Sequence, residues 1–161
     1  MPNGKLAIYP GTFDPITNGH LDIIHRASTL FDRVVVSIAT NPSKEPLFGV
    51  AERVEMIERS TRGLNNITVD HFNGLLMHYA VKKKADVIVR GLRAITDFEY
   101  EFQMALVNRK LAENIITVFL MPNEKYTYLN STIVKEVAKF HGIVSSFVPE
   151  FVENKLKEKF R

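Results

Sequence analysis

Cysteine is absent from this 161-residue sequence. Its absence excludes disulfide bonds and thiolate chemistry, and it fits a chain that works in a reducing compartment. Long hydrophobic runs are missing as well, since no apolar stretch approaches the roughly 18 residues that cross a membrane. Residues 1–5 lead directly into the first predicted strand. We therefore expect a soluble, cytoplasmic protein with no membrane partner.

Three common motifs of enzyme sites are also missing. The sequence has no Gly-x-x-x-x-Gly-Lys-Ser/Thr loop, no Gly-x-Gly-x-x-Gly turn and no Gly-x-Ser-x-Gly elbow. This excludes P-loop kinases, dinucleotide dehydrogenases and serine hydrolases of the usual kinds. Because there is no dense cluster of carboxylates either, we predict no metal site built by the protein. Any Mg²⁺ would be held mainly by the phosphates of a bound nucleotide.

A strong excess of one charge is absent too. The chain has 21 Lys and Arg residues against 18 Asp and Glu residues, which gives a net charge of +3. An isoelectric point near 9.1 is weak support for nucleic-acid binding, because a local cluster of cations matters more than the total. We expect no nucleic-acid partner.

What the sequence does contain is a regular alternation of two patterns. Runs rich in Val and Ile predict strands over 6–10, 34–39, 67–69, 87–89 and 115–120. Helical spacing predicts helices over 19–31, from about 49, over 74–84, 96–112 and 131–141, and from Pro149. The alternation predicts an α/β fold, a doubly wound parallel five-stranded sheet in a single domain over residues 1–161. On the fourth helix, Phe98, Phe102, Ala105 and Leu106 share one side, and we interpret this apolar face as core.

The predicted topology brings scattered polar residues together. In doubly wound sheets, ligands bind outside the carboxyl ends of the strands. The groups that follow the five strands should therefore share one edge of the sheet: Thr12 and His20, Lys44, residues 73–76, Arg90 and Arg93, and residues 126–132.

His20 is the strongest candidate for a chemical role. It stands at a helix start after a glycine-containing turn that follows a strand, where free N–H groups and the helix dipole attract phosphate. An imidazole there could donate a hydrogen bond to a phosphoryl oxygen as negative charge grows in a transition state. The other four histidines, at 25, 71, 78 and 141, fit packing or surface roles better.

Structural interpretations of the other candidates stay open at this point. Lys44 and the arginines of Arg90-Gly91-Leu92-Arg93 fit solvated surface positions as well as an anion site. Ser131-Thr132 is a plausible N-cap of the fifth helix. On position alone, Glu101 is expected to be a solvated surface glutamate.

The sequence Gly11-Thr12-Phe13-Asp14-Pro15, followed by Thr17-Asn18-Gly19-His20, resembles the signature of the nucleotidyltransferase superfamily. Together with Arg90-Gly91-Leu92-Arg93, residues 97–101 (DFEYE) and residues 130–137 (NSTIVKEV), the chain is similar to the phosphopantetheine adenylyltransferase family over essentially its full length. Two positions depart from the wider pattern. Thr17 stands where the superfamily has a histidine, and the late motif reads Leu129-Asn130-Ser131-Thr132.

The resemblance implies a Rossmann-like nucleotidyltransferase fold and the reversible transfer of the adenylyl group from ATP to 4′-phosphopantetheine, which gives 3′-dephospho-coenzyme A and pyrophosphate. It implies His20 as stabiliser of the transition state, with Lys44 assisting. It also implies Mg²⁺ carried by ATP, a homohexamer and feedback by coenzyme A.

By the same resemblance, phosphopantetheine is expected to contact Thr12, Lys44, Leu76 and Arg90. ATP is expected to contact Thr12, Phe13, His20, Gly91, Leu92, Arg93, Glu101, Tyr126, Thr127, Tyr128, Leu129, Asn130, Ser131 and Thr132. The alternatives are another acceptor, nicotinate mononucleotide or glycerol 3-phosphate, a non-catalytic nucleotide sensor, and an RNA-binding module.

Overall fold

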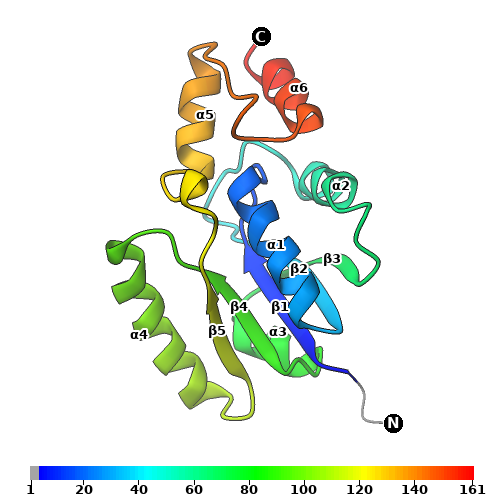
Figure 1. The fold of residues 1–161 in the computed structure, drawn as a ribbon, viewed down its shortest axis with the longest axis vertical. Helices are drawn as coiled ribbons and strands as arrows, with labels where there is room; N and C mark the ends of the chain where they lie inside the picture. Colours follow the sequence, from blue (N-terminus) through cyan, green and yellow to red (C-terminus); the bar gives the residue numbers. More distant parts are fainter. Residues whose placement is uncertain (1–3) are drawn as a thin grey trace.

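A computed structural model describes residues 4–161, except for the side chains of residues 95 and 96. Its centre is a parallel sheet with the strand order β3-β2-β1-β4-β5, shown in Figure 1. The strands are β1 (Leu6–Gly11), β2 (Arg33–Thr40), β3 (Ile67–Asn73), β4 (Val87–Gly91) and β5 (Ile116–Leu120). The predicted parallel five-stranded sheet is confirmed.

The helices occupy the predicted segments with small shifts at their ends. They are α1 (Asn18–Leu30), α2 (Val50–Ser60), α3 (Leu76–Lys82), α4 (Ile95–Leu111), α5 (Ser131–Lys139) and α6 (Glu150–Lys159), with a 3₁₀ turn, η1, at Glu124–Tyr126. Gly49 is the N-cap residue of α2, and its N–H donates to the Glu52 carboxylate at 2.8 Å. Pro149 is the N-cap residue of α6, so the helix begins at Glu150, one position after the start that we expected.

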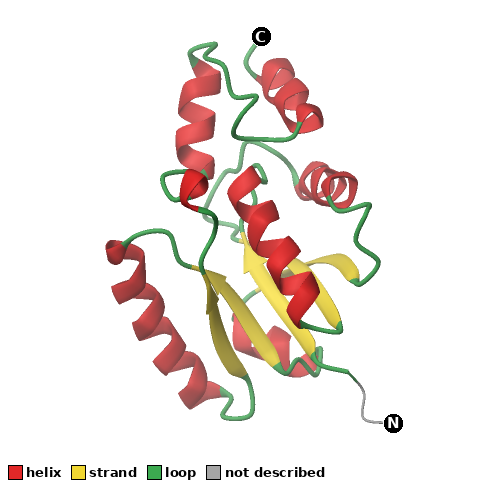
Figure 2. Ribbon diagram, viewed as in Figure 1, coloured by secondary structure: helices red, strands yellow, loops and turns green. Residues whose placement is uncertain are grey.

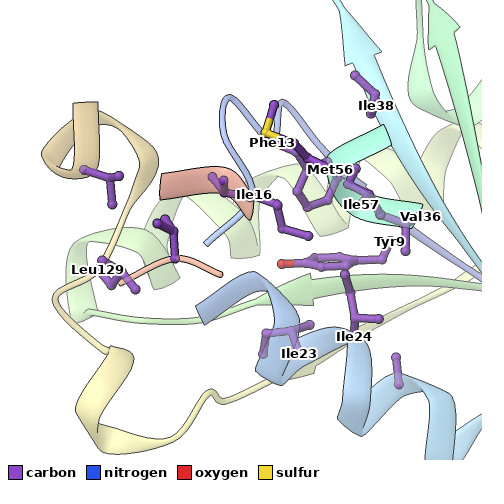
Figure 3. Packing of buried hydrophobic residues seen from close by; sticks show 14 of the residues in the cluster. Tyr9, Phe13, Ile16, Ile23, Ile24, Val36, Ile38, Met56, Ile57 and Leu129 are labelled. Atoms are coloured by element: carbon purple, nitrogen blue, oxygen red, sulfur yellow. The ribbon is translucent and has the colours of Figure 1, made fainter. Parts of the chain in front are cut away.

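Helices cover both faces of the sheet, as Figure 2 shows. Alternate strand residues supply the two cores, because successive side chains point to opposite faces. Ala7 and Tyr9 join a large cluster with α1, α2, α5 and α6, part of which is drawn in Figure 3. Leu6 and Ile8 join a smaller cluster with α3 on the other face. Burial on both faces explains why the strand segments read as continuous apolar runs.

The expected core role of the α4 apolar face is wrong for this chain taken alone. Phe98, Phe102 and Leu106 are all exposed, and the two phenylalanine rings stack on each other with centroids 5.8 Å apart. The helix lies beside β5 at the edge of the sheet (Figure 1) and buries Glu101 and Asn108 instead. A stripe of large apolar residues was therefore an incorrect guide to the inward side of this helix. Across residues 4–161, no helix combines the length and hydropathy of a membrane span.

The packing of α1 against the sheet gives a direct test of the core. Ile24 is fully buried, whereas Leu30 on the same helix is 61% exposed. Ile24→Ala should lower the free energy of unfolding by about 2 to 5 kcal/mol, because it removes apolar contacts and leaves a cavity. Leu30→Ala is the control and should change it by less than about 0.5 kcal/mol. Urea denaturation measures both, and equal effects would contradict the packing described.

Candidate functional site

A cavity of about 330 Å³ opens between the carboxyl ends of β1 and β4. This is the point where the strand order reverses, which is where doubly wound sheets bind ligands. β1 pairs with β2 through six residue pairs but with β4 only through Ala7↔Val87 and Ile8↔Ile88. The two strands therefore separate beyond Ile8. Their last residues line the cavity walls, among them Tyr9, Pro10, Gly11, Arg90 and Gly91.

The loop from β1 to α1 contains Phe13, whose ring is buried. This residue has φ 49°, a left-handed conformation uncommon for a side chain of its size. Its ring packs edge-on against Tyr9 and His20, with centroid distances of 5.4 and 5.0 Å. A Cβ atom on Gly11 would lie 2.9 Å from that ring. Glycine at this strand end thus makes room for the aromatic side chain that supports His20.

Thr17 and His20 form a reciprocal cap at the start of α1. The backbone N–H of Thr17 donates to Nδ1 of His20 at 3.0 Å, and the backbone N–H of His20 donates to Oγ1 of Thr17 at 3.3 Å. Because Nδ1 accepts a hydrogen bond, the proton of the neutral ring belongs on Nε2. The backbone N–H of Thr17 therefore fixes the tautomer of His20.

The charge state of His20 follows from its surroundings. Burial lowers the pKa of the imidazole, and the nearby Arg93 and Arg90 guanidiniums lower it further, to about 3. His20 is therefore a neutral donor near pH 7. A neutral imidazole can donate to a developing oxyanion without having to lose or gain a proton.

Arg90 and Glu101 form a bidentate ion pair at the cavity wall. Nε and Nη2 of Arg90 donate to the two carboxylate oxygens at 2.9 and 2.6 Å, and Nη1 donates to the carbonyl of Pro10 at 3.1 Å. Burial alone would disfavour the Arg90 cation, but the hydrogen bonds and charge of Glu101 outweigh this and raise its pKa. Glu101 is buried, so the surface position expected from its place in the sequence is wrong. Arg90 also bridges β4 and β1 where their pairing has ended.

Arg93 ties the β4 end to the segment before α5. Its Nη1 donates to the carbonyl of Leu129 at 2.9 Å, and its Nε lies 3.4 Å from the Asp97 carboxylate. The N-cap of α5 is Asn130, whose Oδ1 accepts from the N–H of Ile133 at 2.8 Å. Ser131 is the first helical residue and donates to the carbonyl of Pro15 at 2.7 Å. The N-cap role considered for Ser131 and Thr132 is therefore wrong.

The cavity gathers half of the residues that the resemblance implied for ATP. Those that line it are Thr12, Phe13, His20, Gly91, Arg93, Glu101 and Leu129. Within the described part of the chain, the rest lie outside this lining: Leu92, Tyr126, Thr127, Tyr128, Asn130, Ser131 and Thr132. Tyr126 is close, because a Cβ atom on Gly19 would lie 3.5 Å from its Cβ.

Several residues of the cavity wall were not expected from the sequence. Tyr9 and Pro10 are the last residues of the first predicted strand, so the strand-end rule alone could have included them. Asp97 and Tyr100 precede Glu101 by four positions and one position on α4. The helix was expected to begin at residue 96, and α4 begins at Ile95.

The residues implied for phosphopantetheine are spread along the edge. Lys44 lines a second cavity of about 390 Å³ at the end of β2, together with Thr12 and Arg53. Thr12 lines both cavities. Leu76, among the described residues, lies outside both linings; it begins α3 and packs against the smaller core cluster.

The described residues offer no ready metal cage. No three His, Asp or Glu side chains gather as ligands in the part of the chain that the structure covers. A divalent cation would have to bring most of its ligands with a polyphosphate.

Comparison with known proteins gives consistent matches. A cytidylyltransferase-like family model matches residues 8–137. A phosphopantetheine adenylyltransferase of Alkaliphilus metalliredigens is 59% identical over 96% of this chain and 99% of its own length. One of Caldanaerobacter subterraneus is 52% identical over 98% of each chain. Among solved structures, a Vibrio parahaemolyticus protein described as a nicotinate-nucleotide adenylyltransferase shares the fold, with a TM-score of 0.70 at 17% identity over 98% of this chain and 95% of its own.

The tautomer and charge of His20 can be tested by nitrogen NMR of the ligand-free protein. We expect the neutral Nε2–H form from pH 8 down to pH 5, with free imidazole as the titrating control. The unfolded chain takes up this proton near pH 6.5 and the folded chain near pH 3. The free energy of unfolding should therefore carry a His20 contribution that falls as the pH drops from 6.5 toward 3. Titration of the His20 ring near pH 6.5, or an Nδ1–H tautomer, would contradict this account.

Proposed function

The chain belongs to the phosphopantetheine adenylyltransferase family, and we propose from this premise that it transfers the adenylyl group of ATP to 4′-phosphopantetheine. The products are 3′-dephospho-coenzyme A and pyrophosphate, and the reaction is a step of coenzyme A synthesis. The observation that carries the proposal is the sequence identity to these relatives, 59% and 52% over 96% and 98% of this chain. The site supports it through a neutral imidazole donor and two guanidiniums at the switch point of the sheet.

The chemistry asks for positioning more than for proton transfer. The attacking group is already a phosphate anion and needs no deprotonation. The barrier lies in bringing it in line with the α-phosphorus of a polyanionic triphosphate. Fixed donors and cations lower that barrier because they stabilise charge that develops in the transition state.

We assign ATP to the cavity between β1 and β4. Here the Nε2–H of His20 would donate to an oxygen of the transferred phosphoryl group, and Arg93 would supply positive charge. Both side chains are already held in place, His20 by Thr17 and Arg93 by the Leu129 carbonyl. The positive end of the α1 dipole would add a further attraction for phosphate.

We assign phosphopantetheine to the neighbouring cavity, with its phosphate near Thr12, Lys44 and Arg90 and its pantetheine arm toward Leu76. Thr12 supports this arrangement because it lines both cavities. The two substrates would then meet at Thr12, and Lys44 would stabilise the transferred group from the acceptor side.

Mg²⁺, coenzyme A feedback and location are further parts of the proposal. Mg²⁺ would neutralise phosphate charge, and it would be held by the oxygens of ATP, which fits a site where the described residues form no metal cage. Coenzyme A shares the pantetheine arm of the substrate and would compete for the same cleft. We place the reaction in the cytoplasm, where ATP-dependent synthesis takes place.

Pyrophosphate release tests the function together with the role of His20. ATP with phosphopantetheine should release pyrophosphate, whereas CTP, or nicotinate mononucleotide as acceptor, should not. His20→Ala should lower kcat by about 10²- to 10³-fold, because one positioned donor to a developing charge is lost. No release with ATP and phosphopantetheine would refute the function. If His20→Ala releases pyrophosphate at a near-normal rate, His20 does not stabilise the transition state and serves only to cap α1.

We also propose that the chain forms a homohexamer, and the exposed side of α4 supports self-association. Phe98, Phe102, Leu106 and Leu111 are each about half exposed on this helix. Apolar surface of this kind marks an interaction site more often than free surface. The subunit number itself comes from the family resemblance.

Sedimentation measures this association. The wild-type chain should sediment as a hexamer, and Phe102→Glu should shift it to smaller species, because a charge would be buried at the contact. Phe140→Glu is the matched control, since Phe140 is exposed at the end of α5, away from α4, and it should leave the assembly intact. A monomeric wild type would contradict the proposal.

A further inference from the structure

A buried carboxylate, Asp14, lies in the loop between β1 and α1, two residues after Thr12, which lines both cavities. Asp14 is only 3% exposed, and its oxygens accept three hydrogen bonds: from the N–H of Leu47 at 2.9 Å, the N–H of Phe48 at 2.9 Å, and Nζ of Lys135 at 3.0 Å. The donors come from the loop after β2 and from α5. One side chain in the β1 to α1 loop thus joins three separate segments.

The charge of this carboxylate is balanced by two cations. Lys135 pairs with it directly. Arg53 is buried nearby on α2, where burial lowers the pKa of its guanidinium and the Asp14 charge offsets part of that effect. Nη1 of Arg53 donates to the carbonyl of Thr12 at 2.9 Å. A buried ion is retained only with such partners, so removal of the charge should be felt by the whole cluster.

The loop that carries Lys44 depends on Asp14 for its hydrogen bonds to the rest of the site. Residues 41–46 are exposed. Within residues 4–161, the other hydrogen bonds of this loop stay inside it or run to the helix that follows, as from Ser43 to Asn41 and from Gly49 to Glu52. The two Asp14 contacts are therefore its polar tethers to the loop that bears His20.

The start of α5 is held differently. Besides Lys135, it is fixed by the hydrogen bond from Arg93 to the Leu129 carbonyl and by the one from Ser131 to the Pro15 carbonyl. Both contacts remain if the Asp14 charge is removed. The loss of that charge should therefore disturb the Lys44 loop more than the segment before α5.

We propose that Asp14 is a positioning residue that sets the affinity for the phosphate-bearing acceptor. It does so by holding the Lys44 loop at a fixed distance from Thr12 and His20. The inference rests on the proposed function, since it takes the acceptor to bind beside Lys44 and ATP to bind in the β1–β4 cavity.

The test compares binding of the two substrates by calorimetry in Asp14→Asn. This variant keeps the shape of the side chain but loses the charge and one acceptor oxygen. The dissociation constant for phosphopantetheine should rise roughly 10- to 100-fold, as for loss of a hydrogen bond to a charged group. The constant for ATP should stay within about twofold, as for a site that is not coupled to the change.

Two further variants separate positioning from general loosening. Asp70→Asn is the matched control: Asp70 also accepts from a lysine, Lys83, and from a backbone N–H, that of His71, but on β3 beside α3. It should leave both dissociation constants unchanged. Lys135→Met removes the ion pair but leaves the two backbone contacts, so phosphopantetheine binding should weaken less than in Asp14→Asn.

Amide hydrogen exchange gives a readout that does not depend on turnover. In the wild type, phosphopantetheine should slow exchange at Leu47 and Phe48, and ATP alone should not. This measurement decides the matter if Asp14→Asn fails to fold. Unchanged exchange with phosphopantetheine, unchanged phosphopantetheine affinity in Asp14→Asn, or equal loss of affinity for both substrates would overturn the proposal. A wild type that binds phosphopantetheine without adenylyl transfer would refute the proposed function. The binding and exchange measurements would then still decide whether Asp14 positions the Lys44 loop.

Discussion

The short pairing between β1 and β4 is the constraint on which the site depends. Two residue pairs join these strands near their start, and beyond Ile8 they separate. Beyond this point, the backbone carbonyls of β1 and β4 have no hydrogen-bond donor on the other strand. A buried carbonyl needs a donor, which must then come from elsewhere. Arg90 supplies one to Pro10, so the guanidinium at the cavity wall is also a structural bridge. The opening and the charge that lines it arise from the same local geometry.

The electrostatics of the cavity are consistent with this origin. Two arginines beside a partly buried imidazole would make a protonated His20 costly, and this cost explains the low pKa of His20. The arginines and the histidine therefore have different roles in the site. The arginines carry fixed positive charge, and each is held by an acidic or carbonyl oxygen. The histidine contributes a directional donor without adding charge, and Thr17 settles which nitrogen donates.

Much of this could be predicted from the sequence, and the successes share a cause. Strands buried on both faces gave continuous Val and Ile runs, and helices with one buried face gave regular spacing, so the topology followed from local patterns. The strand-end rule then placed His20 and Arg90 at one edge. Side-chain pairing across the fold was not predictable in this way. Nothing near Glu101 in the sequence indicates that its carboxylate is buried against Arg90, because the two are joined only when α4 packs beside the end of β4.

The failure on α4 has a related physical reason. Helical spacing shows that a helix has an apolar side, but it does not show what covers that side. On α4 the buried side includes Glu101, which pairs with Arg90, and Asn108, while the large apolar side chains are exposed. The same helix contributes Asp97, Tyr100 and Glu101 to the cavity wall. This helix is polar toward the cavity and apolar toward solvent, since Phe98 and Phe102 are exposed. The Arg90–Glu101 ion pair fixes the inner side of α4 to the sheet.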